Sequence, residues 1–320
     1  MQAILSVTVP FFALVLCGYL AAHRHVLPES AIPGLNTFVL YFALPSLLFR
    51  FGSGTPIFDL LNPVVLGVWL IAAGVIVFFT IAITLAAPVA LKDAAFGALV
   101  AAFPNTGFMG VPLLVALLGP AAAGPVICVV LADLFVTSSV CIALAQAGDL
   151  SGHGARDGAL RALRGALSNP LPWSIAAGAL FSVAGWTLPG PADTVVKMLA
   201  DAASPVALFT IGAVLHRAGQ HVHGRTPIGR YLPLAGIKLA LHPLLVFGLG
   251  ASALSLGLPV SGFQVSVMVL AAALPSASNV SLLAERYGAD NGRIARIIMS
   301  STAAAFVSFP LLAWLAGAHS

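Results

Sequence analysis

The sequence predicts an all-α membrane protein with ten transmembrane helices, arranged as two inverted repeats of five helices. Three observations carry this prediction: 60% of the 320 residues are hydrophobic, only 8% are charged, and the apolar runs are long. Soluble domains carry about a quarter charged residues, so this chain cannot cover a surface that faces water. We therefore expect the lipid bilayer as its surroundings. Nucleic acid is excluded as a partner, because the arginines lie between apolar runs and form no continuous basic face.

Ten apolar stretches approach the roughly 20 residues that a spanning helix requires. They begin near Gln2, Gly34, Asn62, Lys92, Ala121, Pro170, Pro191, Gly229, Ser261 and Gly292. The first has no positively charged segment before it, which favours a retained span over a cleaved signal peptide. The three cysteines lie inside apolar runs, so neither a disulfide framework nor a metal site is expected.

The distribution of Lys and Arg predicts the orientation. Eleven of these residues, Arg164 and Arg286 among them, fall in loops that follow odd-numbered spans, whereas Arg50 and Lys197 fall on the other face. Cytoplasmic loops carry the excess of positive charge. Both termini are therefore expected on the periplasmic side of a bacterial inner membrane.

The chain divides near its midpoint. Residues 1–146 form the first predicted repeat, 147–169 a cytoplasmic linker, and 170–320 the second repeat. Two motifs recur in the halves: Ala43-Leu44-Pro45-Ser46 resembles Ala203-Ser204-Pro205-Val206, and Ala101-Ala102-Phe103-Pro104 resembles Ala272-Ala273-Leu274-Pro275. Since five spans per half reverse the orientation, the repeats are inverted, which is typical of secondary transporters.

Helices four and nine are predicted to be broken at mid-depth. Pro104 lies 12 residues after Lys92, about 18 Å by helical rise in a core of about 30 Å. Pro275 lies 14 residues after Ser261, about 21 Å by the same measure. Proline removes a backbone donor and crowds the preceding turn, so neither helix is expected to continue. The two breaks should meet.

A half-helix that begins at a break offers unpaired N–H groups and the positive end of its dipole, and two such ends favour an anion. A single proline kink is common in membrane helices, but a matched pair of breaks favours a binding site. The candidate substrate-binding residues are Pro104, Asn105, Thr106, Gly107, Pro275, Ser276, Ser278 and Asn279.

The run Phe103-Pro104-Asn105-Thr106-Gly107-Phe108-Met109-Gly110-Val111-Pro112 resembles the proline crossover of the auxin efflux carrier family. That family includes plant auxin exporters and bacterial malonate and malate carriers. The resemblance implies a scaffold from helices 1, 2, 6 and 7 and an elevator-like transport domain from helices 3–5 and 8–10. It also implies that Asn105 contacts the substrate carboxylate. Span nine is more polar than in plant members, so the resemblance does not by itself imply their aromatic substrate. We also expect a homodimer.

Charged and titratable residues inside predicted spans are further candidates. Lys238 could neutralise the substrate or pair with Asp133, and His242, one turn after Lys238, could satisfy a backbone carbonyl or carry a coupling proton. Asp193, Lys197 and Asp201 recur every four residues and are expected to pair within one helix. No cofactor is predicted, and Na⁺ or H⁺ are the candidate coupling ions.

The leading functional prediction is a secondary transporter that moves small carboxylates such as malonate or malate by elevator-type alternating access. One alternative is an exporter of aromatic or other weak acids of the auxin type. Another is a membrane ligand sensor that transports nothing. An enzyme is not expected, since the sequence has no HExxH zinc motif and no evident catalytic constellation.

Overall fold

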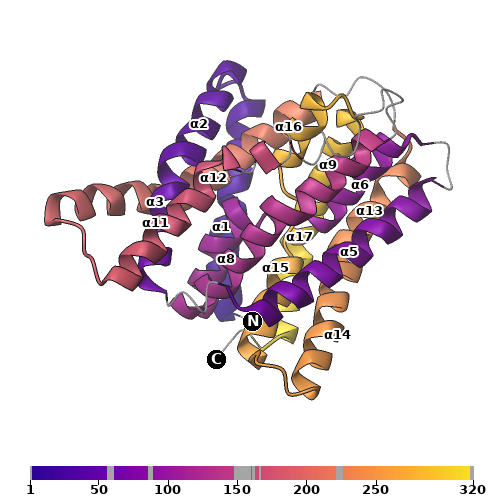
Figure 1. Ribbon diagram of the computed structural model, residues 1–320. Coiled ribbons are helices and arrows are strands. Elements are labelled where there is room, and N and C mark those ends of the chain that lie inside the picture. The colour runs from indigo at the N-terminus through magenta and orange to yellow at the C-terminus, as the bar shows by residue number, and fades with distance from the viewer. Residues whose placement is uncertain are drawn as a thin grey trace.

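The computed structural model describes residues 2–55, 61–85, 89–147, 160, 163–165, 167–220 and 226–317. Within these residues the regular structure is helical throughout, without a β-strand (Figure 1). Seven helical stretches in this part of the chain are long and apolar enough to cross a membrane: Gln2–His23, Glu29–Gly54, Pro63–Leu85, Pro120–Ala147, Gly190–Arg217, Leu232–Ser255 and Asn291–Leu315. The chain is thus a multi-pass membrane protein, as its composition predicts.

The remaining three predicted spans coincide with shorter apolar helices. These are Thr106–Leu118 in the fourth, Pro170–Ala184 in the sixth and Gly262–Ala272 in the ninth. A helix of 11 residues, such as the last of these, reaches about 16 Å and cannot cross the bilayer alone. The count of ten spans in two inverted repeats therefore stays a prediction.

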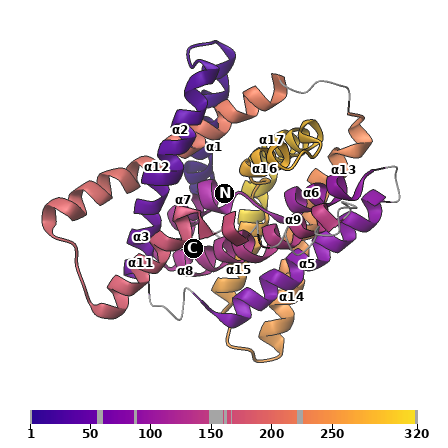
Figure 2. The same ribbon diagram turned by 45° about the horizontal axis from the view of Figure 1, so that its top comes forward.

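One set of helices, here called the first helix group, lies together along one side of the molecule (Figures 1 and 2). It contains α1 (Gln2–His23), α2 (Ile32–Phe38), the π-helical η2 (Val39–Ala43), α3 (Leu44–Gly54), α11 (Pro170–Ala184) and α12 (Gly190–Gln220). Within it, α1 packs along α12, while α3 packs against both α11 and α12.

Glycines let the backbones of this group touch. A Cβ atom on Gly18 of α1 would overlap the carbonyl oxygen of Phe209 in α12, and one on Gly212 of α12 would overlap that of Val15 in α1. Small residues at such crossings allow close van der Waals packing. This packing holds helices together in lipid, where the hydrophobic effect does not drive helices to associate. The positions of these two glycines therefore determine how closely α1 and α12 approach each other.

The charged residues of α12 pair differently from the prediction. The guanidinium nitrogen Nη1 of Arg50 in α3 lies 2.8 Å from Oδ1 of Asp193, so this ion pair joins two helices. Pairing of Asp193 within α12 was the expectation and is wrong, because the tertiary contact brings the arginine of the neighbouring helix to the carboxylate.

The other helices form the second helix group, which begins with α5 (Pro63–Leu85), α6 (Leu91–Ala102), the π-helical η3 (Thr106–Gly110), α7 (Val111–Leu118), α8 (Ala123–Ala132), the π-helical η5 (Asp133–Thr137) and α9 (Ser138–Ala147). It continues with α13 (Leu232–Gly236), the π-helical η7 (Ile237–Leu241), α14 (His242–Ser255), α15 (Gly262–Ala272), α16 (Asn279–Arg286) and α17 (Asn291–Leu315). Short 3-10 turns, η1 (Glu29–Ala31), η4 (Pro120–Ala122) and η6 (Ile228–Arg230), connect helices.

The second helix group has a central helix and a lipid-facing rim. α6 is buried from Ala94 to Ala102 and so has no polar face. The helices around it expose large apolar side chains, such as Phe78 of α5 and Val307 of α17. Exposed apolar surface of this kind suits a bilayer and not water.

Candidate functional site

Two helices stop inside the second helix group. α6 ends at Ala102, and helical structure resumes at Thr106 after an extended Phe103. α15 ends at Ala272, and α16 begins at Asn279. Pro104 and Pro275 lie in these two interruptions, where a proline cannot donate the backbone hydrogen bond of a continuing helix.

The two interruptions pair with each other. The backbone N–H of Asn105 donates to the carbonyl of Pro275 at 2.8 Å, and the N–H of Ala277 donates to that of Phe103 at 3.0 Å. Pro104 and Ser276 thereby form an isolated antiparallel bridge, and we call this contact the crossing. Backbone groups freed by the breaks thus satisfy one another, as the interior of a membrane protein requires.

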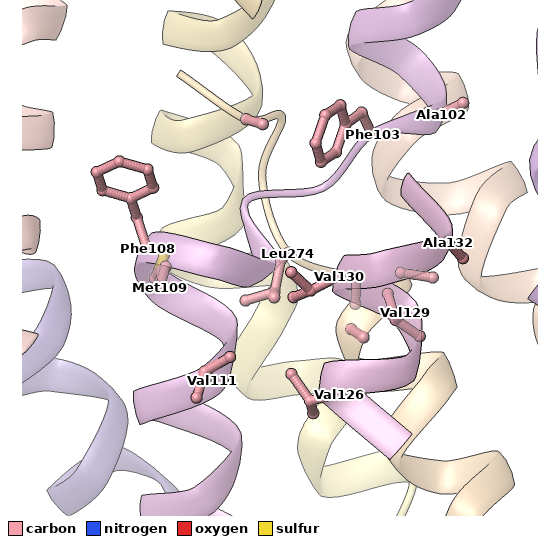
Figure 3. Close-up of a cluster of buried hydrophobic side chains, with 14 of the residues drawn as sticks. Ala102, Phe103, Phe108, Met109, Val111, Val126, Val129, Val130, Ala132 and Leu274 are labelled. Carbon is pink, nitrogen blue, oxygen red and sulfur yellow. The ribbon is translucent and has the colours of Figure 1, made fainter. Parts of the chain in front are cut away.

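The crossing is held from both sides. The N–H of Ser276 donates to the hydroxyl of Ser301 in α17 at 3.2 Å. On the apolar side, Leu274 lies between Met109 and Val130 (Figure 3), and all three side chains belong to the buried core. The packed core fixes the two segments in place, so the polar side chains beside them have defined positions.

Several polar atoms at the crossing are buried without a partner. Among the described residues these include Oγ1 of Thr106, Oγ of Ser276 and Oδ1 of Asn279. Asn105 is also buried, with 3% of its surface exposed. Buried polar atoms are nearly always hydrogen-bonded in proteins, so a group of orphans marks a place where a ligand or water completes the site.

A cavity of about 110 Å³ adjoins the crossing and is lined by Pro104, Asn105, Thr106, Gly107 and Asn279 from the predicted set. Ser278 lines a neighbouring cavity of about 200 Å³ together with Asn279. Pro275 and Ser276 lie in the crossing but are not among the lining residues of either cavity. The structure therefore brings most of the predicted binding residues to one place.

The opposite wall of this cavity was not predicted from the sequence. Asn36 of α2 and Asn169, the N-cap residue of α11, line it from the first helix group, together with Leu40 and Leu171. The side chain of Asn169 accepts a hydrogen bond from the N–H of Leu171 at 3.0 Å. An asparagine within an apolar run was a signal that could have pointed to Asn36.

A second polar cluster lies deeper in the second helix group. It consists of four completely buried side chains, those of Trp69, Asp133, Lys238 and His242. Nε1 of Trp69 donates to Oδ1 of Asp133 at 2.9 Å, and its ring lies 5.1 Å from the imidazole of His242, centroid to centroid. The hydroxyl of Thr137 donates to the same carboxylate oxygen at 2.9 Å.

The contacts of Lys238 differ from the predicted pairing with Asp133. In the described part of the chain, no ion pair joins it to Asp133, and it is not among the lining residues of the cavity at the crossing. Its Nζ atom lies 3.2 Å from Nδ1 of His242 and donates to the carbonyl of Ala272 at 2.6 Å. The lysine therefore touches the end of the helix that leads into the crossing.

The sequence is similar to those of known membrane transport proteins. The chain matches the sequence profile of the family described as "Membrane transport protein" over residues 3–151 and 156–313. A protein of Rhizobium meliloti (strain 1021) named "Putative malonate transporter" is 31% identical over 305 residues, which cover 94% of this chain and 92% of that protein.

Two further relatives carry less specific names. An "Uncharacterized transporter" of Methanothermobacter thermautotrophicus is 28% identical over 314 residues, covering 97% of this chain and 96% of its own. "Uncharacterized transporter YfdV" of Escherichia coli (strain K12) is 24% identical over 289 residues, which cover 87% of this chain and 86% of that protein. The similarity thus extends over nearly the whole length of each chain.

Proposed function

This chain belongs to the membrane transport protein family, the auxin-efflux-carrier-like family that its motifs resemble, and we propose that it is a secondary transporter of small organic anions. Malonate and malate are the expected substrate class, and the relative named as a malonate transporter supports this choice. Family membership points to transport and not to an enzymatic reaction.

The observation that carries the proposal is the set of unpartnered polar atoms at the crossing of two interrupted helices. Thr106, Ser276 and Asn279 present buried oxygens there, beside a cavity that Asn105 also lines. The helices that leave the crossing, η3 with α7 and α16, begin at Thr106 and Asn279. Their N–H groups and dipoles favour a negatively charged ligand, and the neutral side chains can bind a carboxylate reversibly.

The size of the cavity supports a small acid over an auxin-like aromatic acid. Its volume of about 110 Å³ is well below the roughly 300–1,000 Å³ typical of sites for drug-sized ligands. A water molecule occupies about 30 Å³ in the liquid, so the cavity has room for a ligand of only several heavy atoms. A three- or four-carbon dicarboxylate fits that scale.

We further propose ten spans in two inverted repeats, with helices four and nine broken at the crossing. The first helix group would be the scaffold and the second the transport domain that moves in an elevator mechanism. The cavities of about 110 and 200 Å³ support this division, since residues of both groups line each of them. A homodimer, periplasmic termini and insertion in a bacterial inner membrane complete the proposal, the last two on the charge bias of the loops.

The decisive experiment is uptake of labelled malonate by proteoliposomes that contain Asn105→Ala. We expect uptake to be abolished while expression and the gel-filtration profile stay normal. Thr194→Ala, an exposed residue of α12, is the matched control and should transport normally. Uptake by Asn105→Ala at the wild-type rate would exclude Asn105 as a substrate ligand.

The same vesicles separate the remaining alternatives. Imposed gradients of sodium, protons and voltage identify the coupling ion by which gradient drives accumulation. Binding of malonate without counterflow would favour the ligand sensor. Uptake of indole acids in preference to dicarboxylates would favour the auxin-type exporter.

A further inference from the structure

A larger cavity, of about 570 Å³, lies next to the one at the crossing. Its walls come from both helix groups: Leu40 and Tyr41 of η2, residues 164–170 in part, and Arg286 with Tyr287 at the end of α16. Leu40 and Asn169 line both this cavity and the smaller one. The large cavity therefore adjoins the candidate substrate site directly.

The charged groups among the described lining residues of this cavity are both positive. Arg164 and Arg286 line it, and no acidic residue is among its described lining residues. In the described part of the chain, neither guanidinium has an ion-pair partner. Glu285, the nearest acid in sequence to Arg286, is exposed on α16 but does not line the cavity.

The chemistry of the lining suits a small carboxylate. A guanidinium offers paired N–H donors that match the two oxygens of a carboxylate. Ser168 and the two tyrosines, Tyr41 and Tyr287, add neutral hydroxyl groups to the same walls. Arg164 precedes α11 and Arg286 ends α16, so two segments far apart in the sequence each bring one cationic partner for a dicarboxylate to the cavity.

A general excess of positive charge in the loops does not explain this placement. Arg24 shares the predicted cytoplasmic face, yet it lies outside the lining of the cavities described here. Arg164 and Arg286, in contrast, together line the cavity of about 570 Å³ that adjoins the site, and Arg217 lines the neighbouring cavity of about 200 Å³. Positive charge in a concave opening raises the local concentration of anions and their rate of arrival.

We propose that this cavity is an anion-binding vestibule, in which Arg164 and Arg286 hold a dicarboxylate on the cytoplasmic side before it reaches the crossing. The identity of the ligand rests on the proposed function, and the side rests on the predicted orientation. The vestibule is a site for capture and steering, distinct from the polar atoms of the crossing that hold the substrate during transport.

A kinetic experiment tests the role in transport. In oriented proteoliposomes, the double variant Arg164→Gln/Arg286→Gln is expected to raise KM for malonate at the cytoplasmic face about tenfold at low salt. We expect kcat and the KM at the opposite face to stay unchanged, and the difference to shrink at high salt because ions screen the arginines. Arg24→Gln is the matched control, and Arg164→Lys/Arg286→Lys should restore most of the affinity. An unchanged cytoplasmic KM in the glutamine variant overturns the proposal.

A labelling experiment tests the vestibule without relying on transport. Ser168 is exposed and lines the cavity, so Ser168→Cys in a Cys17→Ala background places one accessible thiol there, since Cys128 and Cys141 are buried. An anionic sulfonate thiol reagent should react faster than an uncharged one. The ratio of the two labelling rates should fall about tenfold in the variant Arg164→Gln/Arg286→Gln. An equal ratio in both backgrounds overturns the vestibule, even if malonate is transported. A charge-dependent ratio without malonate transport would support the anion site and reject the proposed function.

Discussion

The ammonium group of Lys238 donates a hydrogen bond to the carbonyl oxygen of Ala272, the last residue of α15, across 2.6 Å. The last four carbonyls of a helix have no partner within the helix, and a cation near them also complements the helix dipole. α15 ends at the crossing in the interior of the protein, where water cannot satisfy those carbonyls. Lys238 therefore stabilises the end of a helix that stops beside the candidate site.

Replacing this lysine should lower stability. In Lys238→Met the carbonyl of Ala272 loses its side-chain donor, and a buried acceptor left unsatisfied costs about 1–3 kcal/mol of the free energy of unfolding. We expect a lower melting temperature of the purified protein in detergent. Lys197→Met, at an exposed position of α12, is the control and should melt like the wild type. An unchanged melting temperature for Lys238→Met would show that the hydrogen bond to Ala272 contributes little.

The contact between α1 and α12 should be intolerant of any side chain. In Gly18→Ala or Gly212→Ala the new methyl group would overlap backbone atoms of the facing helix. Overpacking of this kind costs about 1–3 kcal/mol, because the helices must separate. Gly67→Ala and Gly74→Ala in α5 meet no atom within 4 Å and serve as controls. Thermal melting in detergent measures the difference, and equal melting of all four variants would contradict the close contact.

The two glycines of η3 should differ in their effect on transport. A Cβ atom on Gly110 would lie 2.6 Å from Cδ1 of Leu274, whereas one on Gly107 meets no atom within 4 Å. Leu274 is completely buried and cannot move aside easily. We therefore expect Gly110→Ala to reduce malonate uptake and Gly107→Ala to reduce it much less.

A rescue experiment separates local crowding from a general defect. Leu274→Ala removes the atom that the new methyl group would meet, so the double variant Gly110→Ala/Leu274→Ala should transport better than Gly110→Ala alone. If the double variant is no better, contact with Leu274 is not the cause of the loss.

The crossing could be predicted from the sequence, whereas the wall that faces it could not. Pro104 and Pro275 were readable because proline has a fixed local consequence for a helix at any position. Asn36 stands out as an asparagine within an apolar run, but neither it nor Asn169 could be placed at the crossing, because which residues face the crossing depends on how the two helix groups pack. The partner of Lys238 escaped prediction for the same reason, since a backbone carbonyl carries no mark in the sequence.

The π-helical turns were also beyond prediction. Asp133 begins one of them, η5, and Lys238 lies in another, η7. An extra residue in a turn rotates the side chains that follow it, so the exact direction of these side chains could not be predicted from an ideal helical period. The family resemblance, in contrast, rested on a contiguous motif, and the profile match confirmed it.

The hydrogen bond between Asn105 and Pro275 has a consequence for biogenesis. These residues are 170 positions apart in the chain. During synthesis, Asn105 is therefore inserted long before Pro275, whose carbonyl accepts its hydrogen bond, has been made. Contacts between residues so far apart in the sequence form late. Until the ninth predicted span arrives, the interrupted backbone at Pro104 needs water or another protein to satisfy it. The first half of the chain, produced alone, should then be a target for membrane proteases, while the completed chain closes the crossing and escapes them.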